Sequence, residues 1–278
     1  MRDLLRALLR LTRARVGLTL VALLCLLALL APVFTPYGPE VQIDLATRQM
    51  LPPSLSHPLG TDFYSRDMLA RVLFGARISL SIAILAVIVS VTIGTTVGLA
   101  AGFIGGTIDA VVMRFVDAAL AIPRVFLLLV VLALWRNIGV PGLIVILGLT
   151  SWFVIARIVR AEVLSLKSRE FVVATRALGY RSGRVAWHHL LPNVATPIIV
   201  AATLGVGQII LLEAGLSFLG IGVRPPTPSW GTMIADGRLH LATAWWISTF
   251  PGLAIMVTVV GFSLIGDGLR DALDPRSQ

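Results

Sequence analysis

The chain has 278 residues, of which 57% are hydrophobic and 13% are charged. Charge-free runs recur that are long enough to cross a bilayer, which takes about 20 helical residues, so we expect an integral membrane protein. The net charge of +9, with a single lysine at Lys167, is typical of basic cytoplasmic loops and does not indicate nucleic-acid binding. The one cysteine, Cys25, excludes an intrachain disulfide framework and a multi-cysteine metal site.

The first fifteen residues predict a cytoplasmic amphipathic segment that lies in the membrane interface. One helical face would carry leucines and the other arginines: Leu4, Leu5, Leu8, Leu9 and Leu11 against Arg2, Arg6, Arg10 and Arg13. A cleaved signal peptide is the alternative. The apolar run that follows is about 19 residues long and has no small-x-small cleavage site, which favours an uncleaved span.

The places where charges stop predict six transmembrane helices and thus an all-α, polytopic membrane helix bundle. The spans are 16–34, 78–103, 111–135, 138–156, 194–212 and 245–266. A loop of residues 35–76 follows the first span, and a tail of residues 267–278 follows the last. An even number of spans puts both termini on one side of the membrane.

Basic residues set the orientation of these spans. Arginines are dense in residues 1–15 and again in residues 157–193, which also contain Lys167. The positive-inside rule places both segments in the cytoplasm. We therefore expect cytoplasmic termini, an external loop at 35–76 and a cytoplasmic loop at 157–193.

Some residues within the spans are unusual for helices that face lipid. Gly94, Gly98 and Gly102 repeat every four residues and predict close approach of a second helix. In the third span, three charged residues at helical spacing predict either an ion pair near the cytoplasmic end or the lining of a pathway: Arg114, Asp117 and Arg124. Glu213, at the end of the fifth span, has the same two interpretations, packing or pathway.

The sequence gives no sign of catalysis by this chain. It has no HExxH or GxSxG motif, and no GxxxxGK[ST] loop for ATP. We expect a non-catalytic membrane subunit without a cofactor of its own. If the protein does work, another subunit supplies the energy.

The cytoplasmic loop contains two short predicted helices. The first covers residues 170–178 and ends at Gly179, which suits a left-handed helix end; the second begins near Ser182 and ends before Pro192. Four residues would wrap much of the first helix in apolar surface, so a partner protein should cover it: Phe171, Val172, Val173 and Leu178.

The segment PPTPSWG at 225–231 lies between the last two spans. Its prolines forbid a regular helix, and Trp230 suits a membrane interface. We expect either a rigid surface turn or a segment that shapes the outer mouth of a pathway or the docking surface for a binding protein.

Several motifs together resemble the dipeptide, oligopeptide and nickel permeases of ABC importers. The motifs are HPLGTDFYSRD at 57–67, GARISL at 75–80, EAGLSFLGIG at 213–222, PPTPSWG at 225–231 and GDGLRDALDP at 266–275. In the loop, Ala174, Gly179 and the pair Leu191-Pro192 match the family's coupling signature, although Thr175 replaces its second alanine and Val173 its usual glutamate. Ser65 also stands where the family commonly has glycine.

This resemblance implies a type I ABC importer transmembrane fold, with residues 77–266 as the transmembrane domain and 157–193 as its coupling loop. Phe171, Ala174, Thr175, Leu178 and Gly179 would then contact an ATPase subunit.

The resemblance also implies the surroundings of the chain. A second homologous permease, two cytoplasmic ATPases that bind ATP and Mg, and an external solute-binding protein would assemble with it in a bacterial inner membrane. A peptide is the expected substrate. Nickel or another small solute is an alternative, as is, from a different class, a membrane anchor or sensor scaffold without transport.

Overall fold

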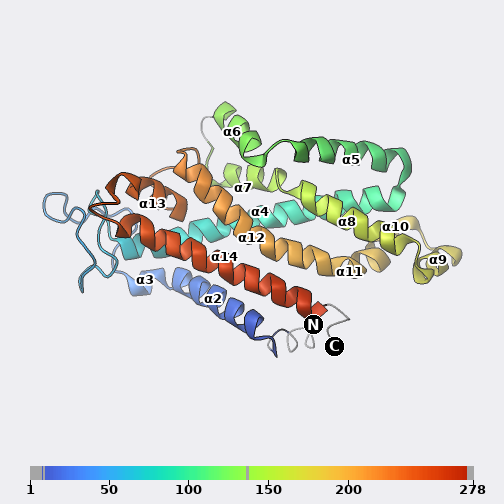
Figure 1. The fold of residues 1–278 in the computed structure, drawn as a ribbon, viewed down its shortest axis with the longest axis horizontal. Coiled ribbons are helices and arrows are strands. Elements are labelled where there is room, and N and C mark those ends of the chain that lie inside the picture. The colour runs from blue at the N-terminus through green and yellow to red at the C-terminus, as the bar shows by residue number, and fades with distance from the viewer. Residues whose placement is uncertain (1–7, 9, 136–137, 274–278) are drawn as a thin grey trace.

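The computed structural model describes residues 8, 10–135 and 138–273, and within them the fold is all-α. Figure 1 shows an elongated bundle of helices that run roughly along its long axis. In chain order the elements are α2 (Thr12–Leu29), α3 (Ala31–Phe34), α4 (Met68–Ile104), α5 (Gly106–Ala121), α6 (Arg124–Leu134), α7 (Val140–Leu149), α8 (Trp152–Lys167), α9 (Glu170–Ala177), α10 (Ser182–Arg184), the π-helical turn η1 (Val185–Leu190), α11 (Leu191–Asn193), α12 (Ala195–Phe218), α13 (Trp230–Gly237), the 3₁₀ turn η2 (Arg238–His240) and α14 (Trp246–Leu273).

The described helices confirm the predicted membrane bundle. Five segments are long and apolar enough to cross a bilayer, namely α2, α4, α7 with α8, α12 and α14. The pair α5 and α6 makes a sixth if its two bent halves are counted as one span. The predicted amphipathic segment at 1–15 lies mostly outside the described residues. Within this segment, Leu8 and Ala14 are buried in one cluster with Leu269 of α14.

The third span is not the single helix predicted for 111–135. It consists of α5 and α6, which meet at an angle of 88°. Pro123 explains the break, because a proline disfavours helical geometry in the residue before it, and Ile122 is extended with φ −85° and ψ 124°. Arg124 is consequently the first residue of α6, whereas Arg114 and Asp117 lie on α5.

The second span begins ten residues earlier than predicted, so the loop after the first span covers residues 35–67. Asp67 caps α4 by accepting a hydrogen bond from the backbone N–H of Ala70 at 2.8 Å. The last helix, α14, continues to Leu273 and so includes residues that were predicted to form a tail. Charged residues near helix ends account for both differences, because hydropathy detects the membrane segment rather than the whole helix.

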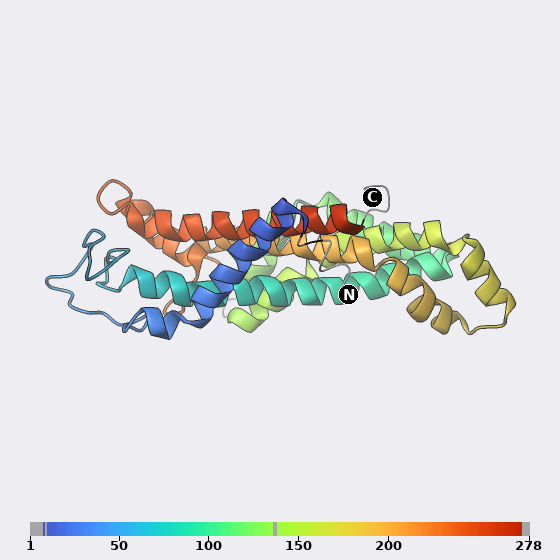
Figure 2. The same cartoon turned by 90° about the horizontal axis from the view of Figure 1, so that it is seen from below.

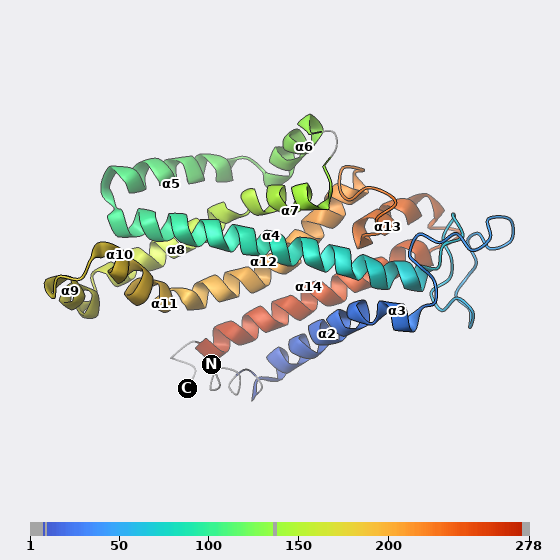
Figure 3. The same cartoon turned by 180° about the vertical axis from the view of Figure 1, so that it is seen from behind.

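The long helix α4 lies at the centre of the bundle and packs against α7, α8 and α12, while α2 packs against α14. Figure 3 shows α4 running along most of the bundle. The predicted glycine face is confirmed. A Cβ atom on Gly94 would lie 2.7 Å from Cβ of Ile155, and one on Gly102 would lie 3.0 Å from Cβ of Val163.

The two ends of the bundle differ in structure. The loop 35–67 and α13 form one end, and α9 with the turns after it forms the opposite end. Figure 2 shows α9 projecting beyond the other helices. The first residues of α2 and the last residues of α14 lie toward the α9 end, away from the loop (Figure 1).

Candidate functional site

The helix α9 is held to its own chain by one side and leaves another side exposed. Val172 is fully buried and packs in a cluster with Val163, Val185 and Leu190. Phe171 is 41% exposed and Leu178 is 76% exposed. The helix thus presents apolar surface outward at the end of the bundle, as its sequence predicted.

The predicted stop at Gly179 is confirmed. Its φ is +78°, in the left-handed region, and the last turn closes with a hydrogen bond from the N–H of Leu178 to the carbonyl of Ala174 at 3.0 Å. Ala174 is exposed, so a partner can approach the backbone there. The hydroxyl of Thr175 donates to the carbonyl of Val172 at 2.8 Å, so it is occupied within the helix.

The second predicted helix, from Ser182 to a point before Pro192, is a series of short turns. It consists of α10, the π-helical turn η1 and α11, which includes Pro192. Val185 and Leu190 of η1 are fully buried and cover Val172. These turns return the chain from α9 to α12 and fix the position of α9 relative to the bundle.

The three charged residues predicted on one face of the third span do not act together. Asp117 forms an ion pair with Arg157 of α8, and Arg114 is exposed. The bend at Pro123 removes Arg124 from their face. The ion-pair interpretation therefore holds for Asp117, whose partner Arg157 lies on another helix.

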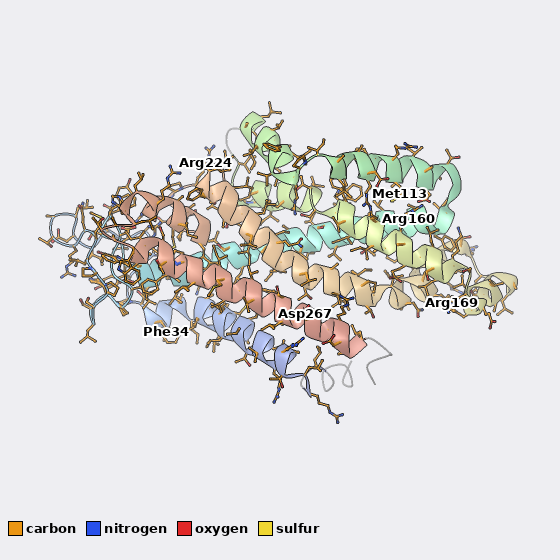
Figure 4. The ribbon with its side chains drawn as sticks, in the orientation of Figure 1. Phe34, Met113, Arg160, Arg169, Arg224 and Asp267 are labelled. Atoms are coloured by element: carbon orange, nitrogen blue, oxygen red, sulfur yellow. The ribbon has the colours of Figure 1, made fainter. Side chains whose placement is uncertain are left out.

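A second ion pair joins the same two helices. Nε of Arg160 on α8 lies 2.5 Å from Oδ1 of Asp109 on α5, and its Nη2 atom lies 2.6 Å from Oδ2. Such a two-point contact between guanidinium and carboxylate fixes orientation as well as distance. Figure 4 shows Arg160 and Met113 between α8 and α5. The sequence reasoning missed this pair, although the acidic residue in the first turn of α5 was a visible signal.

Glu213 lies in the interior of the chain, with 1% of its surface exposed. Its Oε1 atom accepts hydrogen bonds from the hydroxyls of Ser217 at 2.7 Å and Ser229 at 3.0 Å. Ser229 precedes α13, so Glu213 connects α12 to that helix. These contacts favour the packing interpretation of Glu213.

Trp230 does not lie exposed at a membrane interface, although its sequence context suggested that position. It is fully buried, and its indole N–H donates to the carbonyl of Val72 at 3.0 Å. Its backbone N–H donates to the hydroxyl of Ser79 at 3.1 Å. Trp230 begins α13 directly after the proline-rich turn, and this turn aims its side chain at α4 rather than at solvent.

The motif at 57–67 forms a buried polar network at the end of the bundle opposite α9. Asp62 is fully buried and accepts hydrogen bonds from Arg66 at 2.7 Å and Arg71 at 2.5 Å. Nδ1 of His57 lies 2.9 Å from Oδ2 of Asp67. On the exposed part of the loop, the hydroxyl of Thr47 donates to Asp44 and holds the pKa of that carboxyl below its ordinary value.

The sequence of this chain is similar to those of known proteins. Residues 94–278 match the family of binding-protein-dependent transport system inner membrane components, and residues 1–53 match the N-terminal transmembrane domain of oligopeptide transport permease C. The dipeptide transport system permease protein DppC of Escherichia coli (strain K12) is 46% identical over 270 residues, which cover 95% of this chain and 89% of that protein. DppC of Alkalihalophilus pseudofirmus is 39% identical over 263 residues, covering 95% and 86%. A putative peptide permease protein of Brucella suis is 42% identical over 264 residues, covering 94% and 86%.

This chain belongs to the binding-protein-dependent permease family. It is a multi-pass inner-membrane component of ABC transport systems, with the all-α fold of the DppC-like and OppC-like permeases. The match that begins at residue 94 includes α5 to α14, and thus α9 and its apolar surface.

The structure shows the surroundings of two residues at which this permease departs from the family pattern. Ser65 has φ +60°, a conformation that glycine adopts more readily, and its Oγ atom accepts a hydrogen bond from the N–H of Asp44 at 3.1 Å. Val173 stands at the usual position of glutamate and is 55% exposed. It adds apolar surface to α9 where the family pattern has a charge.

Proposed function

We propose that this permease forms, with a second homologous permease, the membrane pathway of an ABC importer for di- and oligopeptides. Two cytoplasmic ATPases that bind ATP and Mg would supply the energy, and an external solute-binding protein would deliver the peptide. The names of the relatives, which are dipeptide and peptide permeases at 39% to 46% identity, support the peptide as substrate.

The observation that carries this proposal is the position and surface of α9. It lies at the end of the bundle opposite the loop 35–67, and it exposes Phe171, Val173 and Leu178. A helix of eight residues is too short to persist alone in water, so a partner that covers it would stabilise it. Contact with an ATPase would bury Phe171 and Leu178, and each would contribute about 1.5 to 3 kcal/mol.

The same geometry supports an orientation. The beginning of α2 and the end of α14 lie toward the end that contains α9 (Figure 1). If α9 contacts a cytoplasmic ATPase, both termini are cytoplasmic and the loop 35–67 faces the solute-binding protein. This is also the orientation that the arginine distribution predicts.

Reconstitution tests the proposal. The permease is purified with the second permease, the ATPases and the binding protein that the proposal requires, and is placed in lipid vesicles. We expect ATP-dependent uptake of a labelled dipeptide that requires the binding protein. Uptake of Ni²⁺ in place of the peptide would support the nickel alternative, and a stable complex that transports neither would support a scaffold.

A further inference from the structure

A cavity of about 350 Å³ lies inside the bundle where α4, the α5–α6 bend, α7, α8 and α12 meet. Its volume falls within the range of pockets that bind small molecules, about 300 to 1,000 Å³. Most of its wall is apolar. The polar side chains that line it come from α4, α6, the junction of α7 and α8, and α12: Ser90, Arg124, Thr150, Ser151 and Gln208.

Arg124 brings a positive charge into this cavity without a carboxylate to balance it. Its Nη2 atom donates to the carbonyl of Leu147 at 3.2 Å and to the hydroxyl of Ser151, while its buried Nε atom has no acceptor among the described residues. In the same part of the chain, no acidic side chain lines the cavity. Within residues 8, 10–135 and 138–273, Arg124 has no salt bridge, whereas Arg157 and Arg160 of α8 each have one.

Ser90 supplies a second unpaired donor from α4. It is 1% exposed, and its Oγ atom forms no hydrogen bond with the residues that the structure describes. On the same helix the hydroxyls of Thr92 and Thr96 donate to backbone carbonyls. The buried hydroxyl of Thr95 also has no partner among the described residues, but Thr95 does not line this cavity. A buried polar group without a partner is costly, so two of them in one cavity point to a ligand.

The chemistry of the unpaired groups defines the ligand. A guanidinium N–H and a hydroxyl are donors, and together they match a carboxylate, which only accepts hydrogen bonds when it is ionised. A metal cation would be repelled by Arg124. Gln208 also lines the cavity and is exposed, so the cavity reaches the surface of the chain at α12.

We propose that this cavity binds the terminal carboxylate of a peptide in transit, with Arg124 and Ser90 as its ligands. The inference rests on the proposed function, because it assigns one group of that substrate to a site in this chain. The apolar wall would contact peptide side chains without selecting a sequence. Such a division suits a permease that carries many peptides.

The test compares two substrates in the complete reconstituted transporter. One is a labelled dipeptide and the other is the same dipeptide with its carboxylate converted to an amide, each at a concentration that saturates the binding protein. We expect Arg124→Gln to lower the ratio of acid uptake to amide uptake about tenfold or more, because the site then loses its charged donor. Ser90→Ala should lower the ratio less. Thr92→Val is the matched control on α4, since Thr92 does not line the cavity.

The possible outcomes distinguish failure of the proposed subsite from failure of the proposed function. Wild-type uptake with an unchanged ratio in both variants, or an equal loss of both substrates, overturns the subsite alone. A wild-type transporter that imports neither compound overturns the proposed function and the subsite with it. If Arg124→Gln does not assemble, as judged by gel filtration, Ser90→Ala decides the test.

A second measurement decides the question if the wild-type transporter carries the amide too slowly for its uptake to be quantified. A dipeptide with a photoreactive side chain is irradiated during turnover, and the labelled peptides of the permease are mapped by mass spectrometry. We expect label on cavity residues such as Leu127 or Ile158, and much less of it in Arg124→Gln or Ser90→Ala. Label confined to other helices, or equal label in the variants, overturns the subsite.

Discussion

Nη1 of Arg71 lies 2.5 Å from Oδ2 of Asp62, and the two side chains are 3% and 0% exposed. Arg66 donates to the same oxygen at 2.7 Å, and Arg71 also reaches Asp236 of α13 at 3.3 Å. The network therefore ties the loop 35–67 to the first turn of α4 and to α13. We infer that this end of the permease behaves as one rigid unit.

Removing the charge of Asp62 should destabilise this unit. In Asp62→Asn two buried guanidinium groups lose their shared carboxylate, and breaking a buried ion pair costs about 3 to 5 kcal/mol. We expect a lower thermal midpoint for the purified complex. Glu40→Gln, which changes an exposed acid of the same loop, is the control. Equal midpoints for the two variants would show that the network contributes little.

Ser65 offers a test of backbone strain against a hydrogen bond. Ser65→Gly relieves the left-handed φ of +60°, worth about 1 kcal/mol, and loses the bond from Asp44, worth about 0.5 to 1.5 kcal/mol, so stability should change little. Ser65→Ala loses the bond and keeps the strain, so it should be less stable by about 1 kcal/mol. Thermal melts of both variants decide this, and an alanine variant as stable as the glycine variant would contradict it.

Substitution by alanine should change stability in opposite directions at a glycine in the contact between α4 and α8 and at an open glycine of α12. A Cβ on Gly98 would lie 2.9 Å from Cβ of Val159, so Gly98→Ala should destabilise the permease by about 1 to 3 kcal/mol. A Cβ on Gly215 of α12 would meet no atom of the described residues within 4 Å, so Gly215→Ala should be neutral or stabilising by up to about 1 kcal/mol. The thermal midpoints of the two complexes test this, and equal shifts would refute the close approach of α4 and α8.

Local signals in the sequence predicted the parts of this structure that depend on neighbouring residues. Gly179 ends α9 because a left-handed φ is a property of one residue, and the glycines of α4 mark a face by their spacing alone. Pro123 carried an equally local signal for the bend between α5 and α6, but the apolar run around it outweighed that signal.

The remainder required the arrangement of distant segments. Trp230 resembles an interfacial tryptophan in sequence, yet it is buried because α13 packs against α4, where its partner Ser79 lies 151 residues earlier in the chain. Ser90 and Arg124 likewise lie on different helices, and only the fold brings them to one cavity. No spacing rule along the chain connects such residues.

Cysteine labelling tests the orientation of the bundle. In a Cys25→Ser background, Gln49→Cys in the external loop should react with a membrane-impermeant maleimide in intact cells. Gly183→Cys, an exposed position after α9, should react only after the membrane is permeabilised. The reverse pattern would invert the topology and remove α9 from the cytoplasm.

The proposed coupling role of α9 depends on its exposed apolar face and on the turn at Gly179. Ala174→Asp inserts a charge into the proposed contact with the ATPase, and Gly179→Val places a β-branched side chain at φ +78°, which costs about 1 to 2 kcal/mol. Gly183→Ala, at an open position of the same loop, and Arg184→Gln are the controls.

ATP hydrolysis by the reconstituted transporter, measured with and without the peptide-loaded binding protein, tests this role most directly. We predict that Ala174→Asp and Gly179→Val lose the stimulated hydrolysis while the permease still inserts into the membrane, and that both controls retain it. Wild-type stimulation in Ala174→Asp and Gly179→Val would contradict the account and leave α9 as a connector between α8 and α12.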